Sequence, residues 1–403
     1  MFSAIKGWVN KLEQTGNPNV PLFGKWGLLQ IILGLGALTV AALKLAYGLG
    51  PITNLSDNWP WGLWVAFDVG AYIASAAGGF TMAAIVYIFG YEKFRPLVRP
   101  AILIGALCYT IGAIGIMIDL ARSIRIVHPI WMWNHESIMF EVGWCVMMYL
   151  TVLYLEFSNN IFERIGWKKL GNLQHAFIIP LVIFGIMLSF LHQSSLGALF
   201  LINPAQQPLW HGPLMGHLFL VSAMALGLSV LTYFSVILSR SWRMTLRMDI
   251  LSKLGLIIAW IMLVYLAARG VDYAITGNLA TGLNGDWYTV LWVAEVGIGM
   301  LLPMILLFIK KIRSSRSGLL WSTGLMIMGV VLNRINTLVI SQAPNREGSY
   351  FPHILEFVFT FGLIAGAMYV FRLCAKYLPL YTDHMKGLTP EQVKKAPAVI
   401  PAD

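Results

Sequence analysis

Charged residues are scarce in this sequence. Only 11% of its 403 residues are Asp, Glu, Lys or Arg, whereas 58% are hydrophobic. About a quarter of the residues of an average soluble domain are charged, so the composition excludes an ordinary soluble protein and predicts a polytopic membrane protein. The net charge of +10 would indicate nucleic-acid binding in a soluble chain. In a membrane protein, the positions of the basic residues indicate instead which segments face the cytoplasm, and no nucleic-acid partner is expected.

Cysteine is rare as well. Cys108, Cys145 and Cys374 all fall inside apolar runs and have no C-x-x-C spacing. The chain is therefore expected to ligate neither an iron–sulfur cluster nor zinc alone, and the thiols are interpreted as buried core groups. No cleavable signal peptide is expected, because the first 26 residues are polar and lack a short apolar run before a small-residue cleavage site.

Long apolar runs are what the sequence does contain. A membrane-spanning helix needs roughly 20 mainly apolar residues. Such runs fall at 27–49, 62–90, 100–126, 137–159, 175–194, 213–238, 251–273, 288–309, 318–340 and 354–378.

The predicted fold class is therefore an all-α polytopic membrane protein with about ten transmembrane helices. We expect an amino tail at 1–26, where residues 3–14 have the spacing of a short interfacial helix. A transmembrane domain at 27–380 and a carboxyl tail at 381–403 follow.

Basic residues divide sharply between the two sides of this topology. The tails and the even-numbered connections hold 22 of the 28 lysines and arginines. By the positive-inside rule, both tails are predicted to be cytoplasmic and the chain to lie in the inner membrane. The six other basic residues are Lys44, Arg122, Arg125, Arg269, Arg334 and Arg346.

Ionisable groups inside the predicted spans lie almost entirely in the outer half. At 1.5 Å per residue they are roughly 5–15 Å below the outer edge. Such groups normally face a bundle interior or a cavity and indicate function. They are Asp68, Asp119, Glu141, His192, His217, Arg269, Asp272, Glu295, Arg334 and Glu356.

Two acids have a basic partner three residues away on a predicted helix. Asp119 with Arg122, and Arg269 with Asp272, are each predicted to form an ion pair. Such a pair is either purely structural or part of a site.

Glu141 and Glu295 have no such neighbour. Each is expected to be protonated, paired across helices or functional. Glu141 is the stronger candidate, because Ser137 is predicted to share its helical face and His135 and Glu136 come just before it.

Two segments resemble each other. LWVAFDVG (63–70) and LWVAEVG (291–297) each place an acid at a similar depth, Asp68 in the first and Glu295 in the second. Both predicted helices run in the same direction, so the likeness is either a parallel internal repeat or chance.

Histidine, carboxyl and aromatic groups near one interface are what a lipid quinone requires, since its two ring oxygens need hydrogen-bond partners and proton exchange. His192 is a candidate partner because imidazole can both donate and accept. The alternatives are a hydrogen-bonded core histidine, or haem ligation together with His217. Paired histidines at two depths, which transmembrane electron transfer through haems would need, are absent.

Five motifs carry a resemblance to a known family. They are PWGLWVAFDVG (60–70), IDLARS (118–123), NHESIMFE (134–141), LEFSNNIFERIGW (155–167) and HQSSLG (192–197). In this combination they resemble the NrfD/PsrC family of membrane quinone-interacting subunits. The resemblance is greatest to the ten-helix branch that contains HybB of hydrogenases, HmcC, and DsrP of the DsrMKJOP complex.

The resemblance implies a fold built on four-helix bundles, with no haem or iron–sulfur cluster in this chain. It implies menaquinone or ubiquinone bound near the outer face, and electron exchange with a ferredoxin-like iron–sulfur subunit docked there. Quinone reductase or quinol oxidase activity would belong to the whole complex. The implied catalytic residues are His192, Glu141, Asp119 and Asp68, and the predicted quinone contacts are His135, Glu136, Trp133, Arg122 and Ser194.

The branch favours a sulfur-metabolising, DsrMKJOP-like respiratory complex, with a HybB-type hydrogenase as the alternative. A secondary transporter is the alternative from another class, because ten helices and buried charges also describe carriers. The off-centre polar groups and the lack of a helix visibly broken at mid-depth favour the quinone subunit.

Protons released or taken up by the quinone are expected to exchange with the outer face only. Asp68, Tyr72 and Ser75 form a polar stripe leading inward. That stripe is either the start of an inward proton path or ordinary hydrogen bonding between helices.

Overall fold

The computed structural model describes residues 16–17, 19–202, 206–244 and 246–380. Within them, ten helical segments are long and apolar enough to cross a membrane, which confirms the predicted number. The predicted interfacial helix at 3–14 and the carboxyl tail at 381–403 lie outside the described residues.

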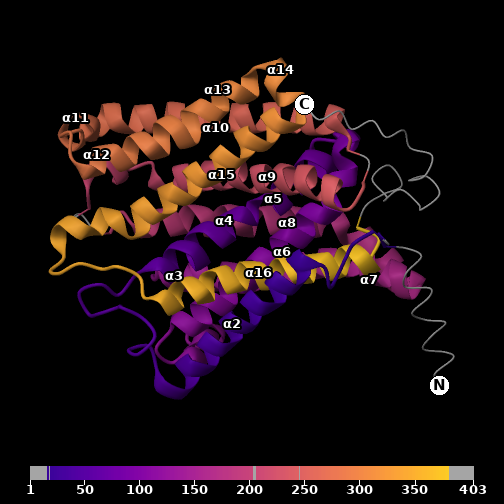
Figure 1. The fold of residues 1–403 in the computed structure, drawn as a ribbon, viewed down its shortest axis with the longest axis horizontal. Helices are drawn as coiled ribbons and strands as arrows, with labels where there is room; N and C mark the ends of the chain where they lie inside the picture. Colours follow the sequence, from indigo (N-terminus) through magenta and orange to yellow (C-terminus); the bar gives the residue numbers. More distant parts are fainter. Residues whose placement is uncertain (1–15, 18, 203–205, 245, 381–403) are drawn as a thin grey trace.

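The spans follow one another with short connections (Figure 1). The second and eighth spans are each broken into several shorter elements. In chain order they are α2 (Lys25–Tyr47); α3 (Leu63–Val65), η1 (Ala66–Tyr72), α4 (Ile73–Ser75), α5 (Ala77–Ala83) and η2 (Ala84–Ile88) together; α6 (Val98–Asp119); α7 (Ile138–Ile165); α8 (Lys168–Leu199); α9 (Met215–Ser241); α10 (Met248–Thr276); α12 (Trp287–Trp292), η6 (Val293–Leu301) and α13 (Leu302–Phe308) together; α15 (Arg316–Leu338); and α16 (Ile354–Tyr377).

The spans form two four-helix bundles. The first contains the second span, α6, α7 and α8; the second contains α9, α10, the eighth span and α15. The second span joins the bundles, because it also contacts α9 and α15. The paired helices α2 and α16 lie at the edge opposite the second bundle (Figure 1).

Burial identifies the centre of the molecule. The most apolar stretch of the second span is 83% buried within the protein, whereas that of α2 is 22% buried. The second span also approaches α9 closely. A Cβ atom on Gly78 would lie 2.6 Å from the carbonyl oxygen of Gly227, so only glycine permits this backbone contact.

The second and eighth spans are not regular α-helices. The sequence predicts an uninterrupted helix in each, but η1 and η6 have π-helical hydrogen bonding. Asp68 lies in η1 and Glu295 in η6, so each interruption coincides with a buried acid in the repeated motif. Short π-helical turns within α-helices are frequent at functional sites.

The third span ends earlier than predicted. Its helix α6 ends at Asp119, and Leu120 is extended with φ −64° and ψ 127°. The prediction of a helix to residue 126 is wrong, because the run that follows is the amphipathic 3₁₀ segment η4 (Ser123–Ile130). Arg122 therefore does not share a helical face with Asp119.

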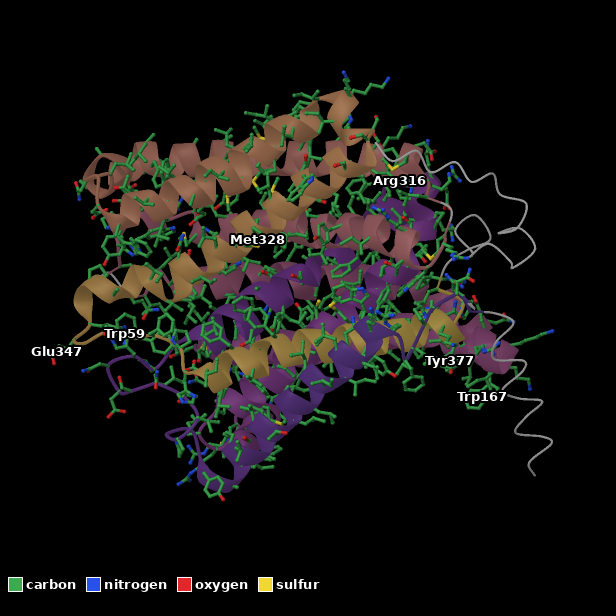
Figure 2. All side chains as sticks on the ribbon, viewed as in Figure 1. Trp59, Trp167, Arg316, Met328, Glu347 and Tyr377 are labelled. Atoms are coloured by element: carbon green, nitrogen blue, oxygen red, sulfur yellow. The ribbon has the colours of Figure 1, made fainter. Side chains whose placement is uncertain are left out.

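The two ends of the described chain lie on the same side of the molecule. The backbone N–H of Asn17 donates to the carbonyl of Ala375 at 3.0 Å, close to the end of α16. Figure 2 shows Trp167, Arg316 and Tyr377 on this side and Trp59 and Glu347 at the opposite ends of the spans. An even number of spans gives this arrangement.

Candidate quinone site

The aromatic pocket is an open hollow of about 440 Å³ between the first turns of α7, the carboxyl-terminal part of α8 and the connection that precedes α7. Small-molecule sites usually measure roughly 300–1,000 Å³ and combine apolar walls with a few polar groups. The residues that line it are Trp133, His135, Phe140, Glu141, Trp144, Cys145, Met148, Leu188 and Leu191.

Aromatic rings in edge-to-face contact form one wall of the pocket. The Trp133 ring lies 5.3 Å from that of Trp144 and 5.4 Å from that of His135. Both indole N–H groups are already used, because Trp133 donates to the carbonyl of Ile130 at 2.9 Å and Trp144 to that of Pro129 at 2.8 Å. The polar groups left for a ligand are the side chains of Glu141, His135 and Cys145.

Glu141 is paired across helices. Ser195 on α8 donates its hydroxyl to Glu141 Oε1 at 2.8 Å. Ser137, predicted to share the face of Glu141, instead begins α7 and accepts from the backbone N–H of Phe140. The polar neighbour of Glu141 is therefore Ser195 on the adjacent helix α8, and not Ser137.

His192 lies on the buried side of α8, behind the pocket wall. It is 0% exposed, and neither ring nitrogen has a hydrogen bond of good geometry to a described residue, although the ring lies near the backbone of Val142. The ring centroid is 5.9 Å from that of Tyr109, which packs at 4.9 Å on Tyr149. His192 therefore lies close to Val142, the residue that follows Glu141 in α7.

The other predicted quinone contacts divide into two sets. Trp133 and His135 line the pocket. Arg122 and Glu136 are exposed and absent from its lining. Ser194 donates to two carbonyls of its own helix, at 2.8 and 3.0 Å, and its neighbour Ser195 makes the contact instead.

Asp68 and Asp119 lie in a second group, apart from the pocket lining. Asp68 is 1% exposed, and neither carboxyl oxygen has a hydrogen-bond partner among the described residues. Its carboxyl packs directly against Gly115 of α6, where a Cβ atom would collide with it. Asp119 lies one turn further out on the same helix and interacts electrostatically with Asp68.

Lys44 of α2 replaces Arg122 as the cation near Asp119. Its ammonium donates to the carbonyl of Leu120 at 2.6 Å and to Ser123 Oγ at 2.5 Å. These bonds draw the chain away from the helix at Leu120, which gives the physical reason for the early end of α6. An isolated lysine within an apolar run is costly to bury without partners. Lys44 could therefore have been recognised from the sequence as a residue that needs polar partners.

Glu356, at the start of α16, accepts three hydrogen bonds that fix the local structure. It accepts from the backbone N–H groups of Asn54 at 3.0 Å and His353 at 2.9 Å, and from the Tyr350 hydroxyl at 2.5 Å. Burial and then the bond to Glu356 raise the pKa of Tyr350, so its hydroxyl keeps its proton. The carboxylate thus caps the helix and fixes the outer connection.

The predicted polar stripe on the second span is ordinary helix bonding. The Tyr72 hydroxyl donates to the carbonyl of Thr360 at 2.7 Å, and Ser75 Oγ donates to that of Ala71 at 2.8 Å. Both hydroxyl protons are committed to backbone acceptors.

A third group lies in the second bundle. Glu295 is 2% exposed and accepts from the Trp210 indole at 2.8 Å and from the amides of Asn333 and Asn336, each at 2.7 Å. Asn333 also accepts from the guanidinium of the fully buried Arg334 at 3.0 Å, so an amide bridges the acid and the base. Hydrogen bonds of this kind offset part of the cost of burying a carboxyl group.

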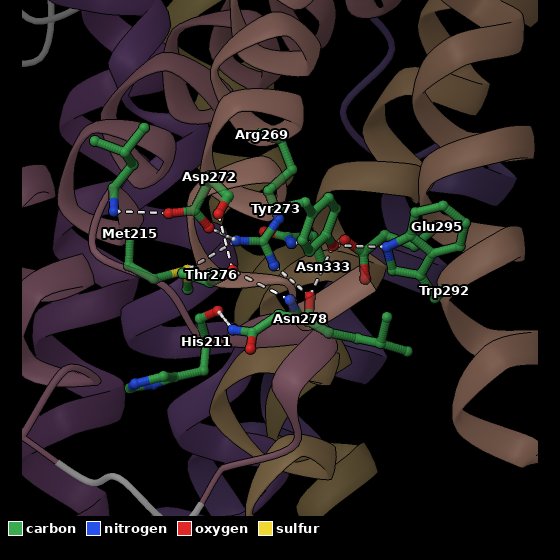
Figure 3. Close-up of polar contacts among 12 residues, drawn as sticks. His211, Met215, Arg269, Asp272, Tyr273, Thr276, Asn278, Trp292, Glu295 and Asn333 are labelled. Carbon is green, nitrogen blue, oxygen red and sulfur yellow. Dashed lines mark hydrogen bonds and ion pairs between the residues drawn. The ribbon is translucent and has the colours of Figure 1, made fainter. Parts of the chain in front are cut away.

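Arg269 and Asp272 form the predicted ion pair, at 2.9 Å within α10 (Figure 3). Both side chains are almost completely buried. Arg269 also donates to the carbonyl of Leu209, and Asp272 accepts from the backbone N–H of Leu214 at 3.0 Å. The pair therefore ties α10 to the connection before α9.

The positions of the histidines are relevant to whether they could ligate haem or a metal ion. His192 is buried whereas His217 is exposed, and no group of three or more His, Cys, Asp or Glu in the described chain is arranged to hold a metal ion.

Comparison with known proteins places these features in a family context. The family described as "Polysulphide reductase, NrfD" matches residues 51–344. A protein of Nitratidesulfovibrio vulgaris is 31% identical, over 92% of this chain and 98% of its own length. The "Probable Ni/Fe-hydrogenase 2 b-type cytochrome subunit" of Escherichia coli is 28% identical over 84% of this chain and 87% of its own. The "Menaquinone reductase, integral membrane subunit" of N. vulgaris is 28% identical over 85% and 88%.

Proposed function

Because this chain belongs to the NrfD family, as its motifs predict, we propose that the aromatic pocket binds the ring of menaquinone or ubiquinone. The chain is a membrane subunit of a respiratory redox complex, as are its relatives. In the proposal, it passes electrons between the quinone pool and an iron–sulfur subunit docked on the outer face.

The pocket carries this proposal. It lies near the ends of α7 and α8 that the sequence predicts to face outward, and Trp133 on its wall is 59% exposed, so a lipid-soluble ring can enter sideways. The aromatic rings on this wall can pack edge-to-face or offset-stacked against a planar ring. Two polar groups that can exchange protons, Glu141 and His135, face the same space.

A quinone supplies two-electron chemistry in which each ring oxygen gains or loses a proton. Glu141 is proposed to donate or accept the proton at its carboxyl, while the hydroxyl of Ser195 orients that carboxyl. His192, one layer behind, is proposed to serve Glu141 or the second ring oxygen as a neutral hydrogen-bond partner. Asp68 and Asp119 are proposed to act in proton exchange rather than by ring contact.

The complex is proposed to act in sulfur metabolism of the DsrMKJOP type, with a HybB-type hydrogenase as the alternative. The family description names polysulphide reductase, and the E. coli relative is named as a hydrogenase subunit. Because that relative is also named as a b-type cytochrome, the expectation of no haem in this chain stays a prediction. A reduced-minus-oxidised visible spectrum of the purified chain tests it.

Photolabelling locates the quinone. A photoreactive short-tail naphthoquinone is expected to label the purified full chain within 133–148 or 188–191, the two segments that line the pocket. Excess unlabelled naphthoquinone should suppress the label, which mass spectrometry of the peptides would quantify. Competable labelling confined to the second bundle would place the quinone elsewhere.

Cysteine accessibility tests the proposed cytoplasmic placement of both tails. With Cys108, Cys145 and Cys374 replaced by alanine, an impermeant maleimide should label Glu347→Cys in intact cells but label Lys311→Cys only after lysis. Both positions are exposed; Glu347 lies at one end of the spans (Figure 2), and Lys311 lies in α14 (Lys310–Arg313) at the other (Figure 1). The reverse pattern would invert the topology and move the pocket to the inner face.

A further inference from the structure

The two π-helical segments offer an internal comparison. Asp68 in η1 and Glu295 in η6 occur in nearly the same sequence motif, and both segments pack against α15. Glu295 receives three side-chain N–H donors. Asp68 receives none from the described residues. The same type of segment thus holds one carboxyl in a complete set of donors and leaves the other without any.

Asp68 is also isolated from countercharge. The charged and titratable groups on the packed elements are Asp119 and Cys108 of α6, Tyr72 of η1, Arg334 of α15, Lys44 of α2 and Glu356 at the start of α16. Tyr72 is bonded to a backbone carbonyl, Arg334 to Asn333, Ser222 and the carbonyl of Phe219, and Lys44 to Leu120 and Ser123. In the described part of the chain, no ion pair includes Asp68.

An ionised carboxylate without donors or countercharge is strongly disfavoured in a buried apolar site, and such a group binds a proton instead. We propose that Asp68 is a proton-binding site within the membrane, occupied at neutral pH and separate from the aromatic pocket. Its ligand is a proton delivered by water.

Asp119 provides the connection to the outer face. It follows Gly115, on which the Asp68 carboxyl rests, by one helical turn, so the two carboxyls lie in sequence toward the outer end of α6. Asp119 is half-buried, and its Oδ1 has no hydrogen-bond partner in the described residues. Asp68 therefore exchanges its proton outward through Asp119, while Lys44 balances the charge of Asp119. This inference deepens the proposed role of both carboxyls in proton exchange, but its test needs no quinone, because neither carboxyl lines the pocket.

Infrared spectroscopy of the full chain in detergent, with carboxyl-¹³C aspartate, tests the site. A protonated-carboxyl band that shifts with the label is expected at neutral pH, is lost in Asp68→Asn and persists in Glu295→Gln. Its hydrogen–deuterium exchange should be slower in Asp119→Asn. A wild-type band unchanged in Asp68→Asn would overturn the proposal, and unchanged exchange in Asp119→Asn would overturn the outward route.

Thermal unfolding gives a second, independent measurement. Asparagine closely matches a neutral aspartic acid in shape and charge, so Asp68→Asn should melt close to wild type. The matched change Glu295→Gln replaces one of two accepting oxygens by an NH2 group that cannot accept from Trp210, Asn333 or Asn336, and should lower the midpoint by several degrees. Equal, large losses in both variants would show that Asp68 is ionised and would refute the proposal.

Discussion

Replacing Glu141 by glutamine is expected to lower quinone-linked turnover of the assembled complex by roughly 10²–10⁴-fold, the range for loss of a general acid or base. Glutamine keeps the size of the side chain and can still contact Ser195, but it cannot exchange a proton with a ring oxygen. Turnover with a soluble quinone analogue in detergent extracts measures the effect, and copurification of the other subunits shows that assembly is intact.

The control is Glu163→Gln, which removes a carboxylate from the inner end of the same helix, where Glu163 pairs with Arg99 at 2.7 Å. It should turn over normally. His192→Ala should also lose activity, whereas Ser195→Ala should lose less, because that serine only orients the carboxyl. Normal turnover of both Glu141→Gln and His192→Ala would exclude the proposed roles.

Replacing Arg269 by methionine is expected to destabilise the protein by about 3–5 kcal/mol, the usual loss when one partner of a buried ion pair is removed. Asp272 would remain buried with no countercharge, and the carbonyl of Leu209 would lose a donor. The midpoint of thermal unfolding in detergent, followed by tryptophan fluorescence, measures the loss.

The double variant Arg269→Met with Asp272→Asn distinguishes charge imbalance from lost packing. It should recover a substantial part of the stability, because no uncompensated charge remains. A double variant as unstable as the single one would mean that the guanidinium acts mainly through its bond to Leu209 and its contact with Tyr273, whose ring centroid is 4.5 Å away.

Composition and hydropathy were sufficient to predict the ten spans, because apolar length alone determines which segments cross a membrane. They could not predict where α6 ends. The residues after Asp119 still include apolar side chains at helical spacing, and the bonds that terminate the helix come from Lys44, which lies 76 and 79 positions before its partners Leu120 and Ser123. The π-helical turns were equally invisible, since they change hydrogen bonding without changing hydropathy.

At the site, the sequence indicated the outer half and the residues Glu141 and His192. It could not choose between Ser194 and Ser195, because adjacent residues point about 100° apart and the rotation of α8 is set by packing. It also grouped Asp68 with Glu141, since depth is readable from sequence but position around a bundle is not. Whether these residues act as predicted is for the variants above to decide.

The segment between α6 and α7 is fastened at both ends. Lys44 holds its beginning, and the indole of Trp144 holds Pro129 near its end. Between them Ile124 is 76% exposed, as expected for a side chain in contact with lipid. A wall fixed in this way does not open and close like a lid. If the pocket binds quinone as proposed, stiffer acyl chains, which slow lateral diffusion of the quinone, should lower turnover of the complex more than a more viscous aqueous buffer does.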